Sequence, residues 1–538
     1  IRIEFGKSGA AHRISAAKQQ LARSGAGNSP QFEDPSLSAV FSRYQRLLHI
    51  QKLVDYDDLI VETCRAMDSD PAWRDELRRR FCHILIDEYQ DLNLGQYLLV
   101  RLLVPETGSG QTLFAIGDPD QSIYGFRGSD HRFFLRFTED YPQARVIELT
   151  RNYRSTETIL AASGQVVQST TNPEARVYSG IEGWPTVGVL ACPSERSEAV
   201  AVGRLIEEQV GGTGFHAIDF GKVDPWSETE RGFGDFAVLA RTVRQLDLLE
   251  EVLCAGGIPV QTVRKDRRYA GIYAPLFSLL RLAAGRPTYQ DLEILLDRVA
   301  GGIGAKTLDD FKRWAYRNRL SGQEAMKNAW RIPIPEMSRS AQKRLCQGFR
   351  QASALAETLA DRFPAEALRR ASAVLQIDET ICQDADVLSD FDGLLEEAEQ
   401  SGPLLGDLLS RIALKTDADM IRPRSETVSL MTLHGAKGLE FPVVVIAGCE
   451  EGFIPLLTSS KKSDSRFLEE RRLFYVGMTR AKERLYFTWA EQRRVFGKKE
   501  PRKMSPFVRD IEQRLVDQRW AQKSQKKANR HQQLELFE

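Results

Sequence analysis

The sequence lacks any apolar run long enough to cross a membrane, and we expect no signal peptide. It has no Cys-x-x-Cys pair, which argues against a zinc site or a disulfide framework and fits a reducing compartment. Net charge is missing too, because 74 Lys and Arg side chains balance 74 Asp and Glu side chains. We therefore expect a soluble, cytoplasmic protein with no membrane partner. Because positive and negative charges balance, a polyanion would have to bind in a local groove. The seven scattered cysteines are Cys64, Cys82, Cys192, Cys254, Cys346, Cys382 and Cys449.

Two adjacent carboxylates, Asp87 and Glu88, directly follow the apolar run 84–86. Such a run predicts a strand that is buried on both faces of a parallel sheet. Ligands of these sheets bind beyond the carboxyl ends of the strands. One carboxylate could hold Mg²⁺ there, and its neighbour could polarise a water. The alternative is a strand followed by an acidic helix N-terminus, which the helix dipole favours.

A second apolar run, 112–116, ends in Gly-Asp and leads into a loop with a carboxamide, two aromatic rings and an arginine. Gln121 could orient a water or a phosphate oxygen. Tyr124 and Phe126 could offer their faces to stacked bases. The loop therefore favours contact with both a phosphate and a base. A turn whose aromatic rings fold into the core is the alternative.

Further blocks of sequence lie at 152–155, 430–441 and 469–481. In this order and spacing, the blocks resemble the motifs of the UvrD/Rep/PcrA branch of superfamily 1 DNA helicases. The resemblance runs from about residue 40 to about residue 510. It implies an α/β fold with two RecA-like P-loop NTPase lobes, the first one incomplete, and helical insertions.

A chain of 538 residues is too long for a single core, so several domains are expected. Apolar runs predict that the second lobe begins with 145–149, continues through 236–241, and resumes at 428–433, 443–447 and 485–488. With the resemblance, the expected parts are a helical subdomain inserted in the first lobe (1–75), the second half of that lobe (76–144), the first part of the second lobe (145–264), a helical insertion domain (265–425), the second part of the second lobe (426–512) and a disordered tail (513–538).

The resemblance also implies roles around a nucleotide. Asp87 would hold Mg²⁺, Glu88 would be the general base, and Gln121 would sense the γ-phosphate of ATP. Arg154 and Arg480 would be arginine fingers that reach the phosphate across the cleft between lobes. The alternative for both arginines is surface salt bridging.

Three further residues are implied to bind the nucleotide. Tyr153 would stack on the adenine, Glu440 would accept a hydrogen bond from the ribose hydroxyl, and Gly438 belongs to the same motif. Ordinary packing or capping is the alternative for Tyr153 and Glu440.

On the DNA side, the resemblance implies that Tyr124, Phe126 and Phe496 stack on successive bases, with His434 along the strand. The position of Phe126 is usually Trp in this family, so we expect weaker stacking here. A lone histidine is more often a core or surface residue than a ligand.

Two other segments predict contacts with partners. The turn 301–307 resembles a helix-hairpin-helix turn, in which Gly302 and Gly304 would let backbone N–H groups approach a phosphate and Lys306 would add charge. A plain interhelical turn is equally consistent with it. The tail, rich in Gln, Lys and Arg from about 519, ends in a segment that resembles the bacterial sliding-clamp binding motif. Its residues are Gln533, Leu534, Leu536 and Phe537.

The phosphate loop that this family needs, Gly-x-x-x-x-Gly-Lys-[Ser/Thr], is not found. Gly6-Lys7-Ser8 ends like one, but Ile1 occupies the position of the first glycine. We expect an exposed loop there. Because the chain starts with Ile1 rather than Met, we also expect an upstream segment and slow or absent hydrolysis by this polypeptide alone.

These observations predict an N-terminally truncated, ATP-dependent 3′–5′ DNA helicase, a single-stranded DNA translocase of DNA repair or replication. Its cofactors would be ATP and Mg²⁺, and its partners single strands, single-strand/duplex junctions and the sliding clamp, in the bacterial nucleoid. The alternative is an adaptor without ATPase activity that binds DNA or is tethered to the clamp. A helicase–nuclease subunit ranks last, because no nuclease-like cluster of carboxylates and Lys follows residue 500.

Overall fold

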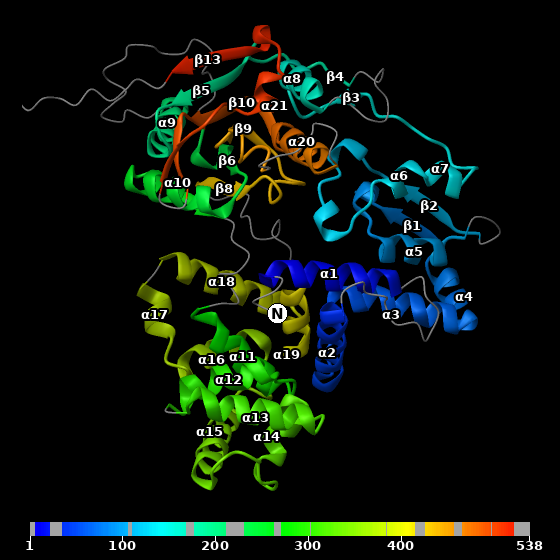
Figure 1. Ribbon diagram of the computed structural model, residues 1–538, viewed down its shortest axis with the longest axis vertical. Helices are drawn as coiled ribbons and strands as arrows, with labels where there is room; N and C mark the ends of the chain where they lie inside the picture. Colours follow the sequence, from blue (N-terminus) through cyan, green and yellow to red (C-terminus); the bar gives the residue numbers. More distant parts are fainter. Residues whose placement is uncertain are drawn as a thin grey trace, which may run out of the picture. The chain divides into compact units, whose positions relative to one another are not determined.

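The chain divides into two compact units in the computed structural model (Figure 1). The first unit comprises Ile1–Ile84, Asn93–Leu113 and Arg264–Thr416, and the second comprises Leu85–Leu92, Phe114–Val263 and Asp417–Glu538. No helix among the described residues is both long and apolar enough to cross a bilayer. The structure describes residues 6–21, 35–105, 110–167, 177–210, 231–262, 271–301, 303–383, 385–414, 426–456, 465–495 and 498–520.

The N-terminal part of the first unit is helical, as the sequence predicts. Its small core joins four helices through Ala17, Phe41, Val61 and Cys64, with Leu98 and its neighbours packed against them. These four helices are α1 (Gly6–Leu21), α2 (Pro35–Gln51), α3 (Tyr56–Ser69) and α5 (Leu94–Leu103), and α4 (Pro71–Arg80) lies between α3 and α5 in the chain without contributing to this core.

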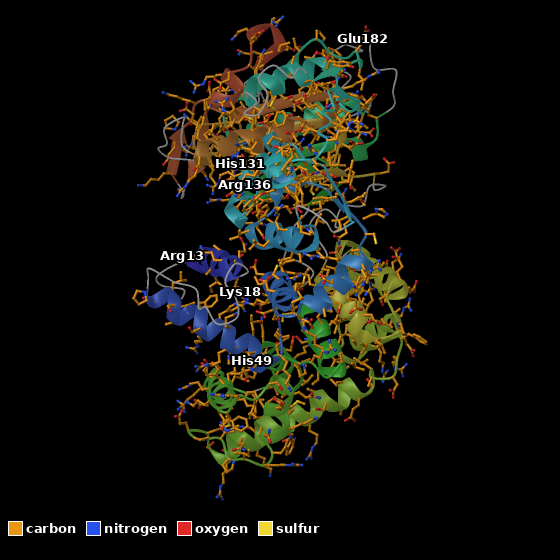
Figure 2. The ribbon with its side chains drawn as sticks, turned by 90° about the vertical axis from the view of Figure 1, so that its right-hand side faces the viewer. Arg13, Lys18, His49, His131, Arg136 and Glu182 are labelled. Carbon is orange, nitrogen blue, oxygen red and sulfur yellow. The ribbon has the colours of Figure 1, made fainter. Side chains whose placement is uncertain are left out.

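A buried lysine ties α1 to the start of α3. Lys18 (labelled in Figure 2) places its ammonium 2.6 Å from Asp55 and 2.7 Å from Asp58. Asp55 and Asp58 also form the capping box of α3, and the Tyr44 hydroxyl donates to Asp55 at 2.8 Å. The same carboxylates therefore satisfy both a helix N-terminus and a buried cation.

The prediction of an exposed loop at Gly6-Lys7-Ser8 is wrong, because α1 begins at Gly6. The segment that follows contains Ala, Lys and Gln at many positions and no Pro. These residues have high helix propensity, and this lets the helix extend back through the two glycines.

The other part of the first unit is also helical and has its own core. Leu279, Leu295, Phe311, Phe349 and Leu394 are among the residues buried in it. Its helices are α11 (Tyr273–Ala283), α12 (Tyr289–Val299), α13 (Ala305–Arg317), α14 (Gly322–Asn328), α15 (Arg339–Glu357), α16 (Pro364–Val374), α17 (Asp378–Gln383), α18 (Ala385–Gln400) and α19 (Leu405–Ala413).

The second unit is built on a parallel sheet, which confirms the α/β fold class. Among the described residues this sheet has seven strands in the order β13-β5-β10-β9-β6-β8-β7. The predicted strands near 236, 428, 443 and 485 are confirmed as β6, β8, β9 and β10. The strands are β5 (Val187–Cys192), β6 (Phe236–Ala240), β7 (Val260–Thr262), β8 (Val428–Thr432), β9 (Phe441–Ile446), β10 (Ala481–Ala490) and β13 (Val516–Trp520).

Helices cover both faces of this sheet (Figure 1). The central strand β6 is buried throughout, and alternate side chains point to opposite faces. Phe236, Val238 and Ala240 pack with α9 and α10, whereas Ala237 and Leu239 pack with α8 and α20. The helices of this unit are α6 (Arg132–Leu135), α7 (Phe137–Asp140), α8 (Glu157–Val167), α9 (Glu195–Gln209), α10 (Val243–Ala255), α20 (Ser465–Met478) and α21 (Pro506–Arg509).

Three pairs of short strands complete the part of the fold that the structure describes. They are β1 (His83–Ile86) with β2 (Thr112–Ala115), β3 (Arg151–Asn152) with β4 (Tyr178–Ser179), and β11 (Gln492–Val495) with β12 (Lys498–Pro501).

The prediction that β1 is buried on both faces is wrong for the structure described here. Along β1, exposed and half-buried side chains alternate, and Leu85 is 74% exposed. Among the described strands, β1 pairs with β2 alone. The apolar run therefore reflects the β-propensity of its residues and the partial burial of one face of the strand, not the burial of both faces.

Two further expectations are corrected. Residues 145–149 form no strand, and Val146, Ile147 and Leu149 are exposed, because no described strand offers this segment an edge to pair with.

The expected disordered tail begins too early, since β13 pairs with β5 from Val516 to Trp520. Pairing with β5 satisfies the backbone hydrogen-bonding groups of this polar segment, and composition alone does not reveal such pairing.

A buried ion-pair network holds the β11–β12 hairpin at the end of the large sheet. Arg493 Nε donates to both oxygens of Glu450, at 2.9 and 2.7 Å, and its guanidinium also pairs with Glu198. Glu198 further accepts from the Gly448 N–H at 2.8 Å and from the Thr488 hydroxyl at 2.6 Å. All the charges are buried and partnered, so the network fixes where the hairpin starts.

Replacing Arg493→Met is therefore expected to lower the free energy of unfolding by about 3–5 kcal/mol, because two buried carboxylates lose their cation. Urea unfolding followed by circular dichroism measures this loss. Arg494→Met, at the exposed neighbouring position, is the matched control and should change stability by less than about 0.5 kcal/mol. Equal losses in the two variants would contradict the role given to the network.

Candidate functional site

The two predicted carboxylates lie where β1 ends. Asp87 is exposed, and Glu88 follows it with φ 53° and ψ 43°. This left-handed conformation is rare for a residue with a side chain and costs on the order of 1–3 kcal/mol. The Glu88 N–H donates to the Asp87 carboxylate at 2.8 Å. The chain thus turns sharply at the strand end and presents both carboxylates.

Gln90, to which the sequence analysis gave no role, joins this turn to the loop after β2. Its buried side chain donates to Glu88 and accepts from the backbone N–H of Asp118 at 3.0 Å. A Cβ at Gly117 would lie 2.5 Å from the Gln90 Oε1 atom and 2.8 Å from the Phe134 ring, so a side chain here would force these neighbours to move. Burial raises the pKa of the Asp118 carboxyl group.

Lys437 connects three segments of the second unit. Its ammonium lies 3.2 Å from Glu88 Oε2 and 3.0 Å from the Gln121 carbonyl oxygen, and it also bonds to Asp91. The side chain of Lys437 is buried. Burial raises the pKa of Asp91, while the positive charge of Lys437 opposes that rise.

Gln121 and Arg480, predicted to act on the same phosphate, touch each other. The Gln121 amide donates to Asp118 at 2.8 Å, and its carbonyl accepts from Arg480 at 3.3 Å. Arg480 also donates to the backbone oxygens of Val476 at 2.9 Å and of Leu439 at 3.2 Å. Burial, followed by the nearby charge of Arg154, lowers the pKa of Arg480 to about 10, while Glu88 opposes this shift. Arg480 remains charged at neutral pH.

Arg154 lines a pocket of about 410 Å³ with Tyr153, Glu440 and Lys482. Arg154 Nε donates to Glu440 at 2.8 Å, and Lys482 pairs with the same carboxylate at 2.6 Å. These bonds, chiefly the one from Lys482, lower the pKa of Glu440. Gly438 precedes this carboxylate with φ 82°, a conformation that favours glycine. The predicted nucleotide residues Tyr153 and Glu440 thus line one pocket.

The predicted stacking residues form an aromatic cluster of Tyr124, Phe126 and His434. Phe126 lies 6.1 Å from Tyr124 and 5.1 Å, edge-on, from His434, measured between ring centroids. Arg127 lies over both phenyl rings. Glu469, which the sequence analysis did not single out, accepts from the Phe126 N–H at 3.3 Å and so holds the loop. Phe126 remains 47% exposed and available to a ligand.

The remaining predicted residues lie elsewhere. Gly304 caps α13 in the first unit, and Lys306 is exposed in its first turn. Phe496, Gly302, Gln533, Leu534, Leu536 and Phe537 fall outside the described residues.

Sequence reasoning missed Gln90, Lys437 and Glu469. Lys437 had a signal, since it is a charged residue between the small residues Ala436 and Gly438. Gln90 and Glu469 had none, because their roles depend on loops distant in sequence.

Within the described residues, no group of three or more His, Cys, Asp or Glu side chains could hold a metal. A Mg²⁺ ion at Asp87 would need oxygens from phosphate and water.

Burial, with repulsion from Arg241 and Arg127, lowers the pKa of His434 from 6.5 to about 4. The folded protein therefore keeps this imidazole neutral, while the unfolded chain protonates it below pH 6.5. Stability is lost as pH falls, by about 2 kcal/mol between pH 7 and 5. Urea unfolding at pH 7 and at pH 5 should show that the His434→Asn variant loses about 2 kcal/mol less stability over this pH change than the unmodified protein does. His49→Asn, on the exposed side of α2 (labelled in Figure 2), should retain it, and identical pH dependence in all three proteins would refute the assignment.

Comparison with known proteins identifies the family of this chain. Residues 7–142 match the UvrD/REP helicase N-terminal domain, and residues 147–324 and 340–492 match the UvrD-like helicase C-terminal domain. The chain is 32% identical over 517 residues to ATP-dependent DNA helicase UvrD1 of Mycobacterium tuberculosis, covering 90% of this chain and 64% of that protein. It is 30% identical to ATP-dependent DNA helicase PcrA of Staphylococcus epidermidis over 92% of this chain and 66% of that protein. The chain thus spans about two thirds of the length of these relatives, and it belongs to the UvrD-like helicase family.

Proposed function

We propose that this chain provides the hydrolytic site and the single-strand-binding surface of an ATP-dependent DNA helicase that moves 3′ to 5′. The supporting observation is that Lys437 joins Glu88 to the backbone of Gln121, whose side chain in turn accepts a hydrogen bond from Arg480. Two relatives are named ATP-dependent DNA helicases, which supports ATP as the substrate and DNA as the partner.

In this proposal, Asp87 holds the Mg²⁺ ion, for which its exposed carboxylate and position at a strand end are suitable. The ion would neutralise charge on the phosphates. Glu88 takes the proton of the attacking water, and the bonds from Lys437 and Gln90 orient its carboxylate.

Gln121, held by Asp118 on one side and Arg480 on the other, is positioned to contact the γ-phosphate. Arg480 and Arg154 supply positive charge where negative charge develops in the transition state. The pocket at Tyr153 and Glu440 would take the adenosine, the ring by stacking and the ribose by a hydrogen bond.

Single-stranded DNA would bind to the aromatic cluster, because stacking accepts any base sequence, as a translocating enzyme requires. The proposal retains two RecA-like lobes with the domain limits given above, except that the tail would begin after Trp520. Contact of the turn at Gly304 and Lys306 with DNA is retained as well. It also retains a cytoplasmic location, a role in repair or replication, and sliding-clamp binding by residues 533–537.

The hydrolytic mechanism predicts that Glu88→Gln slows ATP hydrolysis by about 10²- to 10⁴-fold, because the general base is lost. Single-turnover hydrolysis by the full-length gene product, with single-stranded DNA present, measures the rate. Glu182→Gln, an exposed position in the same unit (labelled in Figure 2), is the matched control and should leave the rate unchanged. An unchanged rate in Glu88→Gln would show that the mechanism assigned to Glu88 is wrong, whereas no hydrolysis by the unmodified protein would favour the adaptor without ATPase activity.

The stacking role predicts that Phe126→Ala weakens binding of single-stranded DNA about 5- to 150-fold, the equivalent of about 1–3 kcal/mol per base. Phe126→Trp should bind more tightly than the unmodified chain, because a larger ring stacks better. Fluorescence anisotropy without nucleotide measures both affinities. Phe363→Ala, at an exposed ring in the first unit, should have no effect. Unchanged affinity in both Phe126 variants would exclude this cluster as the binding surface.

A further inference from the structure

The pocket of about 410 Å³ around Glu440 is also lined by Lys482, to which the proposed function gives no role. Lys482 is the second residue of β10, and Glu440 directly precedes β9. These strands are parallel neighbours in which Ala481 lies opposite Phe441, so the two charged residues lie side by side where the strands begin. The Thr156 N–H donates to the Lys482 carbonyl oxygen at 3.0 Å and fixes the backbone there.

Positive charges outnumber carboxylates in this pocket. Among the described residues that line it, Arg151, Arg154 and Lys482 are cationic, and Glu440 is the only carboxylate. The carboxylate is held from two sides, since Arg154 Nε donates to one oxygen at 2.8 Å and the Lys482 ammonium lies 2.6 Å from the other. The bond from Lys482 is the main cause that lowers the pKa of Glu440, so this side chain is charged at neutral pH.

The pair of Lys482 and Glu440 contributes little to the stability of the fold. The two side chains are 37% and 44% exposed, and an ion pair between groups as exposed as these stabilises a protein only slightly. Because neither group is packed away from solvent, both can reach a molecule that enters the pocket. Their position in the pocket therefore points to a role in binding.

The Lys482 ammonium keeps hydrogen-bond donors for a ligand. An ammonium carries three N–H donors, and within the described part of the chain the bond to Glu440 uses one of them. The neighbouring amide is already occupied, because the side-chain oxygen of Asn152 accepts from the N–H groups of Arg154 and Ser155, both at 2.8 Å. Lys482 and Glu440 thus present a donor and an acceptor next to each other.

A hydroxyl group matches this pair, because it donates one hydrogen bond and can accept another. It would donate to the Glu440 carboxylate and accept from the Lys482 ammonium, and both bonds would be assisted by charge. A phosphate fits less well, because Glu440 would repel it. A site that bonds a hydroxyl in this way rejects the analogue that lacks it, because the polar groups of the site are then left unpaired.

We propose that Lys482 and Glu440 together recognise one ribose hydroxyl of the bound nucleotide, and that Lys482 sets a preference of the site for ribonucleotides over deoxyribonucleotides. The inference rests on the proposed function in that the pocket takes the adenosine of ATP and Glu440 accepts from its ribose. It adds the residue that supplies the donor. Lys482 acts on binding and not on the chemical step.

The test compares ATP, 2′-deoxy-ATP and 3′-deoxy-ATP as substrates of the full-length gene product, with single-stranded DNA present. For the analogue that lacks the recognised hydroxyl, KM should exceed the KM for ATP by about 10-fold. Lys482→Met should raise the KM for ATP by about 10-fold and leave the KM for that analogue unchanged, because only ATP loses a bond. The value of kcat should change little, since the hydroxyl is bound equally before and during the reaction.

Two further variants separate recognition from charge and from folding. Lys482→Arg keeps a cation with several donors and should retain most of the preference for ATP. Lys503→Met, the same change at an exposed position of the same unit, is the matched control and should leave every KM unchanged. Thermal unfolding checks that all the variants are folded.

Three results would each overturn the proposal: equal KM values for ATP and both analogues in the unmodified protein, an unchanged KM for ATP in Lys482→Met, or an equal rise for ATP and the analogue in that variant. Calorimetric titration with the same nucleotides needs no hydrolysis and separates this inference from the proposed function. Binding with the expected preference by a protein that hydrolyses nothing would contradict the proposed function alone. Hydrolysis without the preference would overturn the role of Lys482 alone, and a protein that binds none of the three nucleotides would overturn both.

Discussion

One buried ammonium group holds the candidate site together. Lys437 touches Glu88, Asp91 and the backbone of Gln121, and so joins the turn after β1, the loop after β2 and the segment between β8 and β9. Taking a lysine out of water is costly unless carboxylates compensate it, and these two compensate it only in this arrangement. The two carboxylates depend on the lysine in turn, because they would repel one another without its positive charge. The positions of three loops therefore depend on one side chain.

The strands at the centre of the large sheet could be predicted from sequence because their side chains are buried on both faces. Val443, Val444, Val445 and Ile446 give an uninterrupted apolar run, and such a run has few structural alternatives. The same rule failed for Leu85, where the apolar run accompanies only partial cover. It could not find β13, whose polar sequence pairs with an edge strand through its backbone.

For the candidate site, sequence motifs gave residue types that converge in space, such as Gln121 with Arg480 and Tyr153 with Glu440. They did not give the residues that hold these in place. Gln90 and Glu469 act by hydrogen bonds to backbone N–H groups of loops, and a bond of that kind leaves no pattern along the chain. The overall charge balance likewise concealed the local excess of positive charge around Glu440, because it averages over the whole surface.

Tyr153 is 76% exposed, and the guanidinium of Arg151 lies 4.9 Å from the centroid of its ring. One side of this ring is thus already occupied by a flat cation. A heterocycle that binds in the pocket could therefore stack only on the other face of the Tyr153 ring. This restriction would select the orientation of the heterocycle before any hydrogen bond to Glu440 is made.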